Sequence, residues 1–325
     1  MRAVVQRRFG GPDELVVEDV TDPVPGPAQV RIAVVAAGVH LLDTTIREGR
    51  SGPFGAAELP MVPGREVAGT VDAVGVDVDG SWMGRSVVAH LGAASGGYAS
   101  QVVASVGTLI PFSDAIDAAE AVAMIGTGRT ALGVLEEADL DAHDVVLVTA
   151  AAGGLGTLLV QAAAGLGCTV VGVAGGDAKL DLVRSLGANI VADYLVDGWA
   201  DIVRTALGER RVTVALDGVG GTIGRTAFEL IGPGGRMVLF GYSSGAPMPL
   251  EAADLFARGV AVSAAIGPRL FARPGGIQRL AELAVERLEA GVWSPVVDRF
   301  PLADAADAHR ALTGRRTTGK VVLIP

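Results

Sequence analysis

The sequence predicts an α/β protein of two domains, one of which holds a doubly wound parallel sheet. Its 325 residues are about twice the usual length of a domain. Half of them are hydrophobic, only 4% are aromatic and 46 are glycine, a composition typical of close-packed strands and tight turns. Near Asp144 the pattern of short strands changes to apolar strands that alternate with amphipathic helices, which indicates parallel βαβ units.

The N-terminal segment, to about Ile125, is predicted to be mostly β-structure. Runs of β-prone residues such as "QVRIAVVAAGV" and "REVAGTVDAVG" are separated by stretches rich in proline and glycine, such as "DPVPGPAQ". This alternation predicts a barrel-like β domain whose loops lie on its rim.

The second half of the sequence is predicted to form the parallel sheet and a tail. Its six expected strands are Val145–Ala150, Thr169–Ala174, Ile190–Ala192, Val212–Asp217, Gly235–Phe240 and Ala261–Ile266. A long helix from Gly276 to Ala290 and a final strand, "KVVLIP", follow Pro268. Because this tail is too short to form a domain, we expect residues 1–125 plus 268–325 to form one domain and residues 126–267 the other.

Charge and cysteine content limit the possible partners and location. The formal charge of -10 predicts a surface that repels nucleic acid and anionic membranes. The uncharged run from Val145 to Gly176 is broken by glycines into strand, turn, helix and strand, so it is not a membrane span. No secretion signal is recognisable, and the single cysteine, Cys168, is expected to be a packing residue. The expected location is the cytoplasm.

A dinucleotide-binding turn is predicted where the strand "VVLVTA" runs into "AAGGLG". The fingerprint G-x-G-x-x-G maps onto Ala151, Gly153 and Gly156, with alanine in place of the first glycine. Glycines let the backbone approach a pyrophosphate, and the helix N-terminus supplies amides and a positive dipole. An isolated match of this kind is weak, but the strand before it and the helix after it favour cofactor binding.

The end of the second strand predicts NADPH as the cofactor in preference to NADH. An NAD site usually places Asp or Glu here to bind the ribose hydroxyls. This strand instead ends at Gly175 and Gly176, which leave room for a 2′-phosphate, and Lys179 follows in the next helix. Lys179 can also be interpreted as a solvated helix lysine, but its position favours phosphate binding.

Six motifs identify a family resemblance over essentially the whole length. They are "AAGVHLLDTTIREG", "PMVPGREVAGTVDAVG", "TAAAGGLGTLLVQAA", "ALDGVGG", "FGYSSG" and "TTGKVVLIP". With these motifs the chain resembles the zinc-independent quinone oxidoreductases of the medium-chain dehydrogenase/reductase superfamily, the group that contains zeta-crystallin. The resemblance implies a Rossmann domain inserted in a GroES-like catalytic domain, with NADPH in the cleft between them. It also implies a homodimer, because the strand "AVSAAI" would otherwise leave an apolar sheet edge open.

The resemblance also carries NADPH contacts onto individual positions. These are Thr130, Gly153, Gly154, Leu155, Gly175, Lys179, Tyr194, Gly218, Phe240, Gly241, Ser243 and Arg315. Tyr194 lies fifteen residues after Lys179, as the family spaces its pair around the adenosine phosphate. The neighbouring Arg316 is an alternative to Arg315.

The zinc branch of the same superfamily provides a control. Catalytic zinc needs three ligands such as Cys and His, and structural zinc needs a cluster of four Cys. Here His40 stands where a zinc enzyme carries Cys, and Arg65 beside Glu66 stands where it carries His. With one cysteine in the sequence, no metal is expected.

The sequence departs from the family at the substrate end. Many relatives carry Asn at the position of His40 and Tyr at that of Thr45, whereas Asp43 is retained. His40 and Asp43 are three residues apart on one helical turn and form either a proton relay or a local hydrogen-bonded pair. The other histidines are expected to be non-catalytic: His90, His143 and His309.

The function expected from these features is reduction of a quinone or an α,β-unsaturated carbonyl compound by hydride from NADPH, without a metal. His40 is the candidate proton donor, with bulk water or the nicotinamide ribose hydroxyl as alternatives. Two rival functions remain open. One is an enoyl-thioester reductase of secondary metabolism, and the other is a non-catalytic, crystallin-like NADPH-binding protein.

Overall fold

The computed structural model describes residues 1–50, 57–272 and 275–325. The chain divides into two compact units, the first formed by Met1–Thr127 and Ala281–Pro325 and the second by Gly128–Leu280. The second junction lies inside helix α10 (Gly276–Glu289), beyond the boundary predicted at residue 267. Within the described ranges, no helix is long and apolar enough to cross a membrane.

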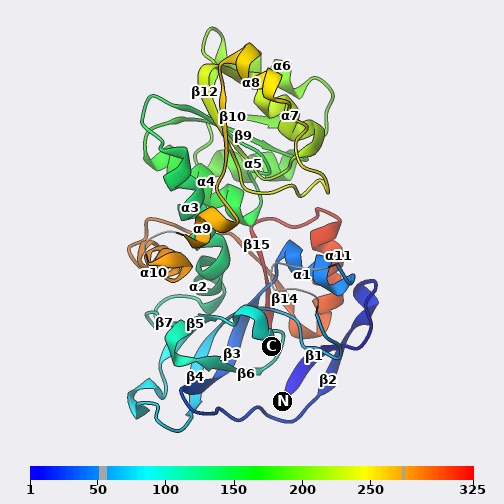
Figure 1. The fold of residues 1–325 in the computed structure, drawn as a ribbon, viewed down its shortest axis with the longest axis vertical. Helices are drawn as coiled ribbons and strands as arrows, with labels where there is room; N and C mark the ends of the chain where they lie inside the picture. Colours follow the sequence, from blue (N-terminus) through cyan, green and yellow to red (C-terminus); the bar gives the residue numbers. More distant parts are fainter. Residues whose placement is uncertain (51–56, 273–274) are drawn as a thin grey trace. The chain divides into compact units, whose positions relative to one another are not determined.

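The second unit is built on a six-stranded parallel sheet with the order β10-β9-β8-β11-β12-β13 (Figure 1). Its strands are β8 (Val145–Val148), β9 (Thr169–Ala174), β10 (Ile190–Asp193), β11 (Val212–Asp217), β12 (Ile231–Leu239) and β13 (Ala261–Ala264). All neighbouring strands are parallel, as their near-continuous apolar runs require for burial on both faces. The Rossmann part of the predicted fold class is therefore confirmed.

Several strand boundaries differ from the predicted ones, and for two of them the structure shows the reason. β8 ends two residues early because Ala150 takes a left-handed φ of 47°, which turns the chain toward the next helix. β12 begins at Ile231 and not at Gly235, because Ile231 already pairs with Val212 ahead of a register shift. Both differences concern backbone geometry that hydrophobic periodicity does not encode.

The helices of the second unit cover both faces of this sheet. They are α3 (Arg129–Ala138), α4 (Gly154–Gly165), α5 (Asp177–Ser185), α6 (Trp199–Leu207), α7 (Gly221–Leu230), α8 (Ala252–Arg258) and α9 (Pro268–Phe271). The chain moves from β8 outward through β9 to β10, then crosses to β11 and continues to β13. Because such crossovers are right-handed, α4 and α5 lie on one face and α6 and α7 on the other.

The first unit contains a mainly antiparallel sheet with the path β14-β15-β3-β4-β5-β7, in which β6 also pairs with β3. The strands are β3 (Gln29–Gly38), β4 (Glu66–Val74), β5 (Ser86–His90), β6 (Gln101–Ser105), β7 (Leu109–Pro111), β14 (Val297–Pro301) and β15 (Lys320–Ile324), with a separate hairpin of β1 (Arg2–Gln6) and β2 (Leu15–Asp19). This is the GroES-like part of the predicted fold, and it is confirmed.

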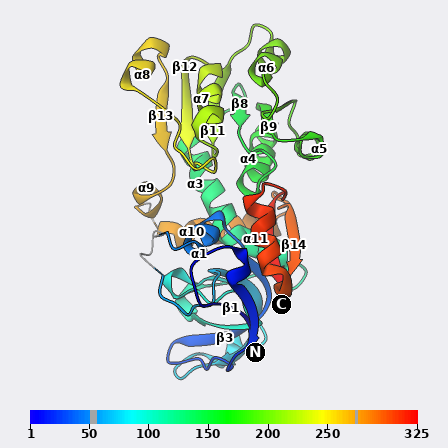
Figure 2. The same cartoon turned by 90° about the vertical axis from the view of Figure 1, so that its right-hand side faces the viewer.

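The C-terminal tail completes the sheet of the first unit. β15 pairs antiparallel with β3, so that Val322 faces Gly38, and β14 extends the sheet beyond β15. Helix α11 (Ala305–Thr313) lies beside β14 (Figure 2), and the remaining helices of this unit are α1 (Leu41–Arg47) and α2 (Ala118–Ala123). Residues nearly 300 positions apart in the sequence therefore become neighbours around the end of β3.

Candidate active site

Ten of the predicted cofactor residues follow the carboxyl ends of the parallel strands, which lie at one edge of the sheet. They are Gly153, Gly154 and Leu155 after β8, Gly175 and Lys179 after β9, Tyr194 after β10, Gly218 after β11, and Phe240, Gly241 and Ser243 after β12. The strand order reverses direction between β8 and β11, and doubly wound sheets bind ligands at such a switch point.

The turn between β8 and α4 is shaped by two glycines with different surroundings. Gly153 is the residue before α4, and a Cβ on it would meet only the Ala150 carbonyl oxygen at 3.2 Å. A Cβ on Gly156 would lie 2.3 Å from the same oxygen and 2.7 Å from the Ala151 Cα. Gly156 thus sets how closely the helix packs on the strand, whereas Gly153 leaves the approach to the helix N-terminus open.

Strands β11 and β12 end in a second close backbone contact. A Cβ on Gly218 would lie 2.4 Å from the Phe240 ring, and the Ser243 N–H donates to the Gly218 carbonyl oxygen at 3.0 Å. The buried Asp217 carboxylate holds this turn by accepting the Thr149 hydroxyl at 2.6 Å and the Val219 N–H at 3.0 Å. Sequence reasoning missed Asp217 and Thr149, although the motif "ALDGVGG" contains the aspartate.

The turn after β9 brings Gly175 next to Tyr194. A Cβ on Gly175 would lie 3.5 Å from the Tyr194 ring, and one on Gly176, at a φ of +87°, would meet nothing within 4 Å. Lys179 lies in the first turn of α5, where its N–H donates to the Gly176 carbonyl oxygen. The Asp193 carboxylate accepts the Gly176 N–H at 3.0 Å. The turn is therefore open at Gly176 and has Tyr194 on one side.

Two further predicted cofactor residues lie apart from these turns along the chain. Thr130 is in the first turn of α3. Arg315 belongs to the first unit, where it follows α11 at a positive φ of 55° and is exposed. Their contacts with a cofactor stay predictions, as does the choice between Arg315 and Arg316.

In the first unit, the His40 imidazole meets a buried pair of opposite charges. His40 precedes α1, and its Nε2 atom lies 2.6 Å from Glu66 Oε1 and 2.8 Å from Lys320 Nζ. Lys320 also donates to Glu66 Oε2 at 2.9 Å. The Glu66 side chain is 0% exposed, that of Lys320 4% and that of His40 32%. Only the histidine of this cluster is open to a ligand.

Two glycines make room for this cluster. Gly38 of β3 is flanked by Glu66 of β4, and a Cβ on it would lie 2.6 Å from Glu66 Oε2 and 3.0 Å from Lys320 Cε. A Cβ on Gly126 would lie 1.6 Å from Glu66 Oε1 and 3.0 Å from His40 Cε1. Glu66 and Lys320 therefore meet across β3 in their present positions because residue 38 has no side chain.

The charged neighbours set the protonation of Glu66. Burial raises the pKa of its carboxyl, but the charges of His40, Lys320 and His90 hold it well below its usual range. Glu66 is thus a carboxylate, and Lys320 provides its compensating charge.

Asp43 is bonded to the backbone of His40 and not to its ring. Asp43 Oδ2 accepts the His40 N–H at 2.8 Å, which fixes the start of α1. Asp43 Oδ1 lies 3.3 Å from Arg65 Nη1. Of the two alternatives open from the sequence, this geometry matches the local pair, and the imidazole finds its partners in Glu66 and Lys320.

A series of buried hydrogen bonds leads from Arg47 through His309 and Tyr98 to Asp43. Arg47 Nη1 can only donate, so His309 Nδ1, 3.0 Å away, accepts and the neutral ring carries its hydrogen on Nε2. Nε2 then donates to the Tyr98 oxygen at 3.1 Å, and the Tyr98 hydroxyl donates to Asp43 Oδ2 at 3.0 Å. Burial, with the nearby Asp43 charge, raises the pKa of Tyr98 well above its usual value, so it remains a donor.

His309 is held neutral within this series of hydrogen bonds. Its side chain is fully buried, and burial lowers its pKa from 6.5 to about 4, with the Arg47 charge acting in the same direction and Asp43 opposing it. His309 is on α11 and His90 ends β5, while His143 lies in an exposed turn, as expected. The prediction that these histidines are non-catalytic remains to be tested.

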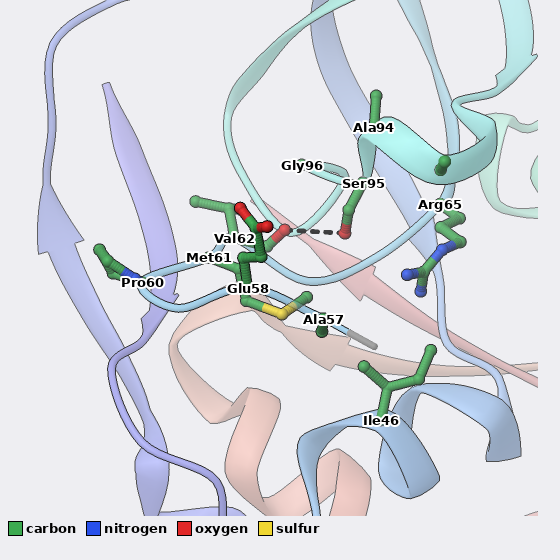
Figure 3. A pocket seen from close by; sticks show the side chains of 11 residues that line it. Ile46, Ala57, Glu58, Pro60, Met61, Val62, Arg65, Ala94, Ser95 and Gly96 are labelled. Atoms are coloured by element: carbon green, nitrogen blue, oxygen red, sulfur yellow. Dashed lines mark hydrogen bonds between the residues drawn. The ribbon is translucent and has the colours of Figure 1, made fainter. Parts of the chain in front are cut away.

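A pocket of about 520 Å³ opens beside α1 in the same unit. Figure 3 shows the side chains around it, among them Ile46 of α1, Met61, Val62 and Arg65, together with the bond from the Ser95 hydroxyl to the Val62 carbonyl oxygen. Most of its lining residues are apolar, with Arg65 and Glu58 as its charged residues, and polar atoms make up about half of its exposed lining. Arg65 therefore connects this pocket to Asp43 and, as the residue before Glu66, to the His40 cluster.

Comparison with known proteins agrees with this architecture. Residues 26–114 match the alcohol dehydrogenase GroES-like domain, and residues 154–286 match the zinc-binding dehydrogenase family. The chain is 32% identical to a 2-haloacrylate reductase of a Burkholderia species, covering 100% of this chain and 99% of the relative. It is also 32% identical to a quinone oxidoreductase of Pseudomonas aeruginosa, with 98% and 97% covered. The chain belongs to the quinone oxidoreductase group of the medium-chain dehydrogenase/reductases.

This family assignment confirms the resemblance recognised in the sequence. The crystal structure of the Escherichia coli quinone oxidoreductase complexed with NADPH superposes with a TM-score of 0.88 at 27% identity, with 100% of each chain covered. The chain is thus an oxidoreductase of this group, with the same arrangement of a GroES-like domain and a Rossmann-type sheet.

In this quinone oxidoreductase-type chain, His40 and Arg65, which stand where the zinc branch of the superfamily is expected to carry ligands, belong to a different set of side chains. Among the described residues, no group of three or more His, Cys, Asp or Glu is placed to hold a metal ion. His40 and Glu66 are adjacent, but the third member of their cluster is the cation Lys320.

Sequence reasoning found His40 and Asp43 but missed Lys320 beside His40 and Tyr98 beside Asp43, and it noted Glu66 only as the residue after Arg65. Glu66 and Lys320 were within the family motifs "PMVPGREVAGTVDAVG" and "TTGKVVLIP". Their charges, opposite and both within apolar strands, are the signal that could have paired them.

Proposed function

We propose that this oxidoreductase uses NADPH to reduce an activated double bond in a quinone or an α,β-unsaturated carbonyl compound. The observation that carries the proposal is the His40 cluster, in which a half-exposed imidazole is backed by Glu66 and Lys320 at the family's catalytic position. This arrangement suits proton transfer to an organic acceptor.

The second unit supports NADPH as the cofactor. The open helix N-terminus at Gly153 suits the pyrophosphate, and the open turn at Gly176, with Lys179 and Tyr194 nearby, suits the 2′-phosphate. The NADPH complex of the E. coli relative favours the same cofactor. When bound, NADPH supplies the hydride, and the protein positions the acceptor and supplies the proton.

His40 is the proposed proton donor. Hydride addition to the β-carbon of an enone leaves an enolate, which needs a proton from a group within hydrogen-bond reach. Asp43 orients this donor indirectly, because it fixes the backbone from which the imidazole projects. The pocket beside α1 has room for a small acceptor.

A small anionic acceptor is a second candidate. The Burkholderia relative is named as a 2-haloacrylate reductase, and a 2-haloacrylate is an unsaturated carboxylate. Arg65 lines the pocket of this chain, and a guanidinium recognises carboxylates well. Steady-state rates with an acrylate and with its methyl ester would separate the two candidates, because only the anion gains from Arg65.

The proposal is tested by His40→Ala and His40→Asn, assayed with NADPH and a panel of quinones and enones. His40→Ala should lower kcat by roughly 100-fold with NADPH affinity intact, as expected for loss of a general acid. His143→Asn, in an exposed turn, is the matched control. A fully active His40→Asn enzyme would assign the proton to water or to the ribose hydroxyl. Absence of turnover with every acceptor would favour an enoyl-thioester substrate or a non-catalytic role.

Cofactor preference has its own test. Lys179→Met should weaken NADPH binding by about 1–3 kcal/mol, the range for a charge-assisted hydrogen bond, and leave NADH binding nearly unchanged. Arg184→Met is the control, because Arg184 lies on the same helix and pairs with Asp181 on the surface. Equal dissociation constants of the wild type for NADPH and NADH would contradict the proposal.

We further propose a metal-free homodimer that acts in the cytoplasm. β13 pairs only with β12 among the described strands, so its other edge is available to a second copy. Light scattering at micromolar concentration should give twice the mass of 32.8 kDa, and elemental analysis should find no stoichiometric zinc.

A further inference from the structure

The two neighbours of His40 Nε2 make opposite demands on that nitrogen. An ammonium only donates, so Lys320, 2.8 Å away, needs a lone pair on Nε2. A carboxylate only accepts, so Glu66 Oε1, 2.6 Å away, needs a hydrogen there. The hydrogen-bond geometry is satisfied toward Lys320, whereas Glu66 Oε1 has no hydrogen-bond partner among the described residues. In the neutral form of the ring, Nε2 therefore accepts from Lys320, and the hydrogen is carried on Nδ1.

Lys320 is confined to this contact. Its ammonium is buried and bridges His40 Nε2 and Glu66 Oε2, and the latter balances its charge. The cluster packs directly against the backbone at Gly38 and Gly126, where a Cβ would meet its side chains. The titratable and charged groups around His40 are Asp43 on α1, Arg65 just before β4, Glu66 on β4, His90 on β5 and Lys320 on β15.

The residue type at position 320 is informative. Of the 26 lysines and arginines in the sequence, only Lys179 and Lys320 are lysines. A guanidinium would balance Glu66 equally well, but it does not release a proton in proteins, whereas a buried ammonium can. The chain thus has, beside the exposed histidine, the one type of strong cation that can act as a proton source.

We propose that Lys320 is a positioning residue that fixes His40 in its Nδ1–H tautomer and supplies the proton that His40 passes on. The relay part rests on the proposed function. As Nδ1–H gives its proton to the enolate carbon, that N–H bond breaks and a C–H bond forms. At the same time a Lys320 N–H bond breaks and Nε2–H forms.

The relay is balanced in charge and atoms. The imidazole is neutral before and after the transfer, the ammonium becomes a neutral amine, and the enolate loses its negative charge. A proton from water then returns to Nδ1, and the hydrogen on Nε2 returns to Lys320. Without Lys320, a neutral imidazole would have to become an imidazolate to donate, which is a much poorer acid.

The tautomer is tested without any assay of activity. The probe is ¹⁵N NMR of histidine-labelled protein at mildly alkaline pH, with His40 assigned from the His40→Asn spectrum among the four histidines. We expect Nδ1–H in the wild type and in Lys320→Arg, because arginine also donates to Nε2. In Lys320→Met the hydrogen should move to Nε2 and bond Glu66. Nε2–H in the wild type would overturn the proposal.

A second variant keeps the test valid if Lys320→Met does not fold with Glu66 unpaired. Lys320→Met combined with Glu66→Gln removes both buried charges, and its His40 should lose the strong preference for Nδ1–H. A wild-type tautomer in this double variant would also contradict the role of Lys320.

The relay is tested by kcat of Lys320→Arg, which keeps the tautomer but cannot supply the proton. We expect kcat to fall at least 10-fold, with unchanged KM for NADPH and for the acceptor. Full activity of Lys320→Arg would remove the relay. If the wild type turns over no acceptor, the proposed function fails, but the NMR result still decides the tautomer.

Discussion

The cofactor edge of the parallel sheet and the His40 cluster are built in opposite ways. At the cofactor edge, backbone atoms determine the geometry, and the two decisive glycines, Gly153 and Gly156, are three residues apart. In the His40 cluster, charged side chains determine the geometry, and two of the residues in contact, His40 and Lys320, are 280 positions apart in the sequence. A site made of backbone is therefore encoded in a short segment, whereas a site made of side chains depends on how distant strands pair.

The difference predicts different sensitivities to mutation. Added volume at the cofactor edge meets rigid backbone, which can move only with its strand. Added volume in the His40 cluster meets the ends of side chains, which can shift, but the buried charges cannot tolerate loss of a partner.

The largest expected effect is that of Gly156→Ala. Its Cβ would lie 2.3 Å from a backbone carbonyl oxygen and 2.7 Å from a Cα, so α4 must move away from β8. We expect a loss of at least about 3 kcal/mol in the free energy of unfolding, at the upper end of overpacking costs, together with loss of NADPH binding. Urea unfolding and a binding titration measure the two.

Gly165→Ala is the matched control for this prediction. Gly165 lies in the same helix, and a Cβ on it meets nothing within 4 Å. Alanine there should stabilise the protein by about 0.5–1 kcal/mol through its helix propensity. If the two variants unfold alike, close packing of α4 on β8 is not the reason for Gly156.

The strands and glycine turns of the cofactor edge could be predicted from the sequence because they are encoded in short segments, whereas their contacts with a cofactor stay predictions. The six strands, the glycine turns and Lys179 each follow from a local pattern of a few residues. The Glu66–Lys320 pair does not, because it requires two registers, Gly38 opposite Glu66 and Val322 opposite Gly38. No periodicity within β4 or β15 specifies which residues of β3 they face.

Asp43 shows that a local pattern can also fail to predict a side-chain contact within a single turn of helix. Spacing placed it next to His40, but spacing could not tell whether its carboxylate would bond the ring or the backbone. That outcome depends on Arg65 and Tyr98, which reach Asp43 from outside α1.

The second-largest expected effect is a pH dependence of the free energy of unfolding, caused by His309 in the series of hydrogen bonds that ends at Asp43. The pKa of His309 is about 4 in the folded protein and 6.5 as its ordinary value, so between these values the unfolded state binds more protons. Stability therefore rises with pH through this window and is lost as the pH falls from 6.5 toward 4. The loss approaches about 3 kcal/mol at full protonation, from about 1.4 kcal/mol per pKa unit.

This pH dependence is measured as the difference between the wild type and His309→Gln. Free energies of unfolding at pH about 7.5 and about 4.5 should differ more in the wild type, because glutamine does not titrate. His143→Gln, at an exposed position, should retain the wild-type dependence. Equal slopes for the wild type and His309→Gln would mean that His309 titrates normally and that the buried series of hydrogen bonds does not depend on its neutral form.

The smallest expected effect is that of Gly38→Ala, which adds one methyl group between Glu66 and Lys320. The Cβ would lie 2.6 Å from Glu66 Oε2 and 3.0 Å from Lys320 Cε, and both atoms belong to side chains that can shift by a few tenths of an ångström. We expect a cost of about 1–2 kcal/mol, below that of Gly156→Ala, because no backbone has to move. Gly107→Ala, where the nearest atom is 3.9 Å away, should change stability by less than about 0.5 kcal/mol.

The side-chain shift in Gly38→Ala should also lengthen the contact of Lys320 with His40, so the ¹⁵N signals of His40 should change in Gly38→Ala and stay constant in Gly107→Ala. A Gly38→Ala protein as unstable as Gly156→Ala would mean that the charged cluster is as rigid as the backbone turn, and the contrast between the two sites would then fail.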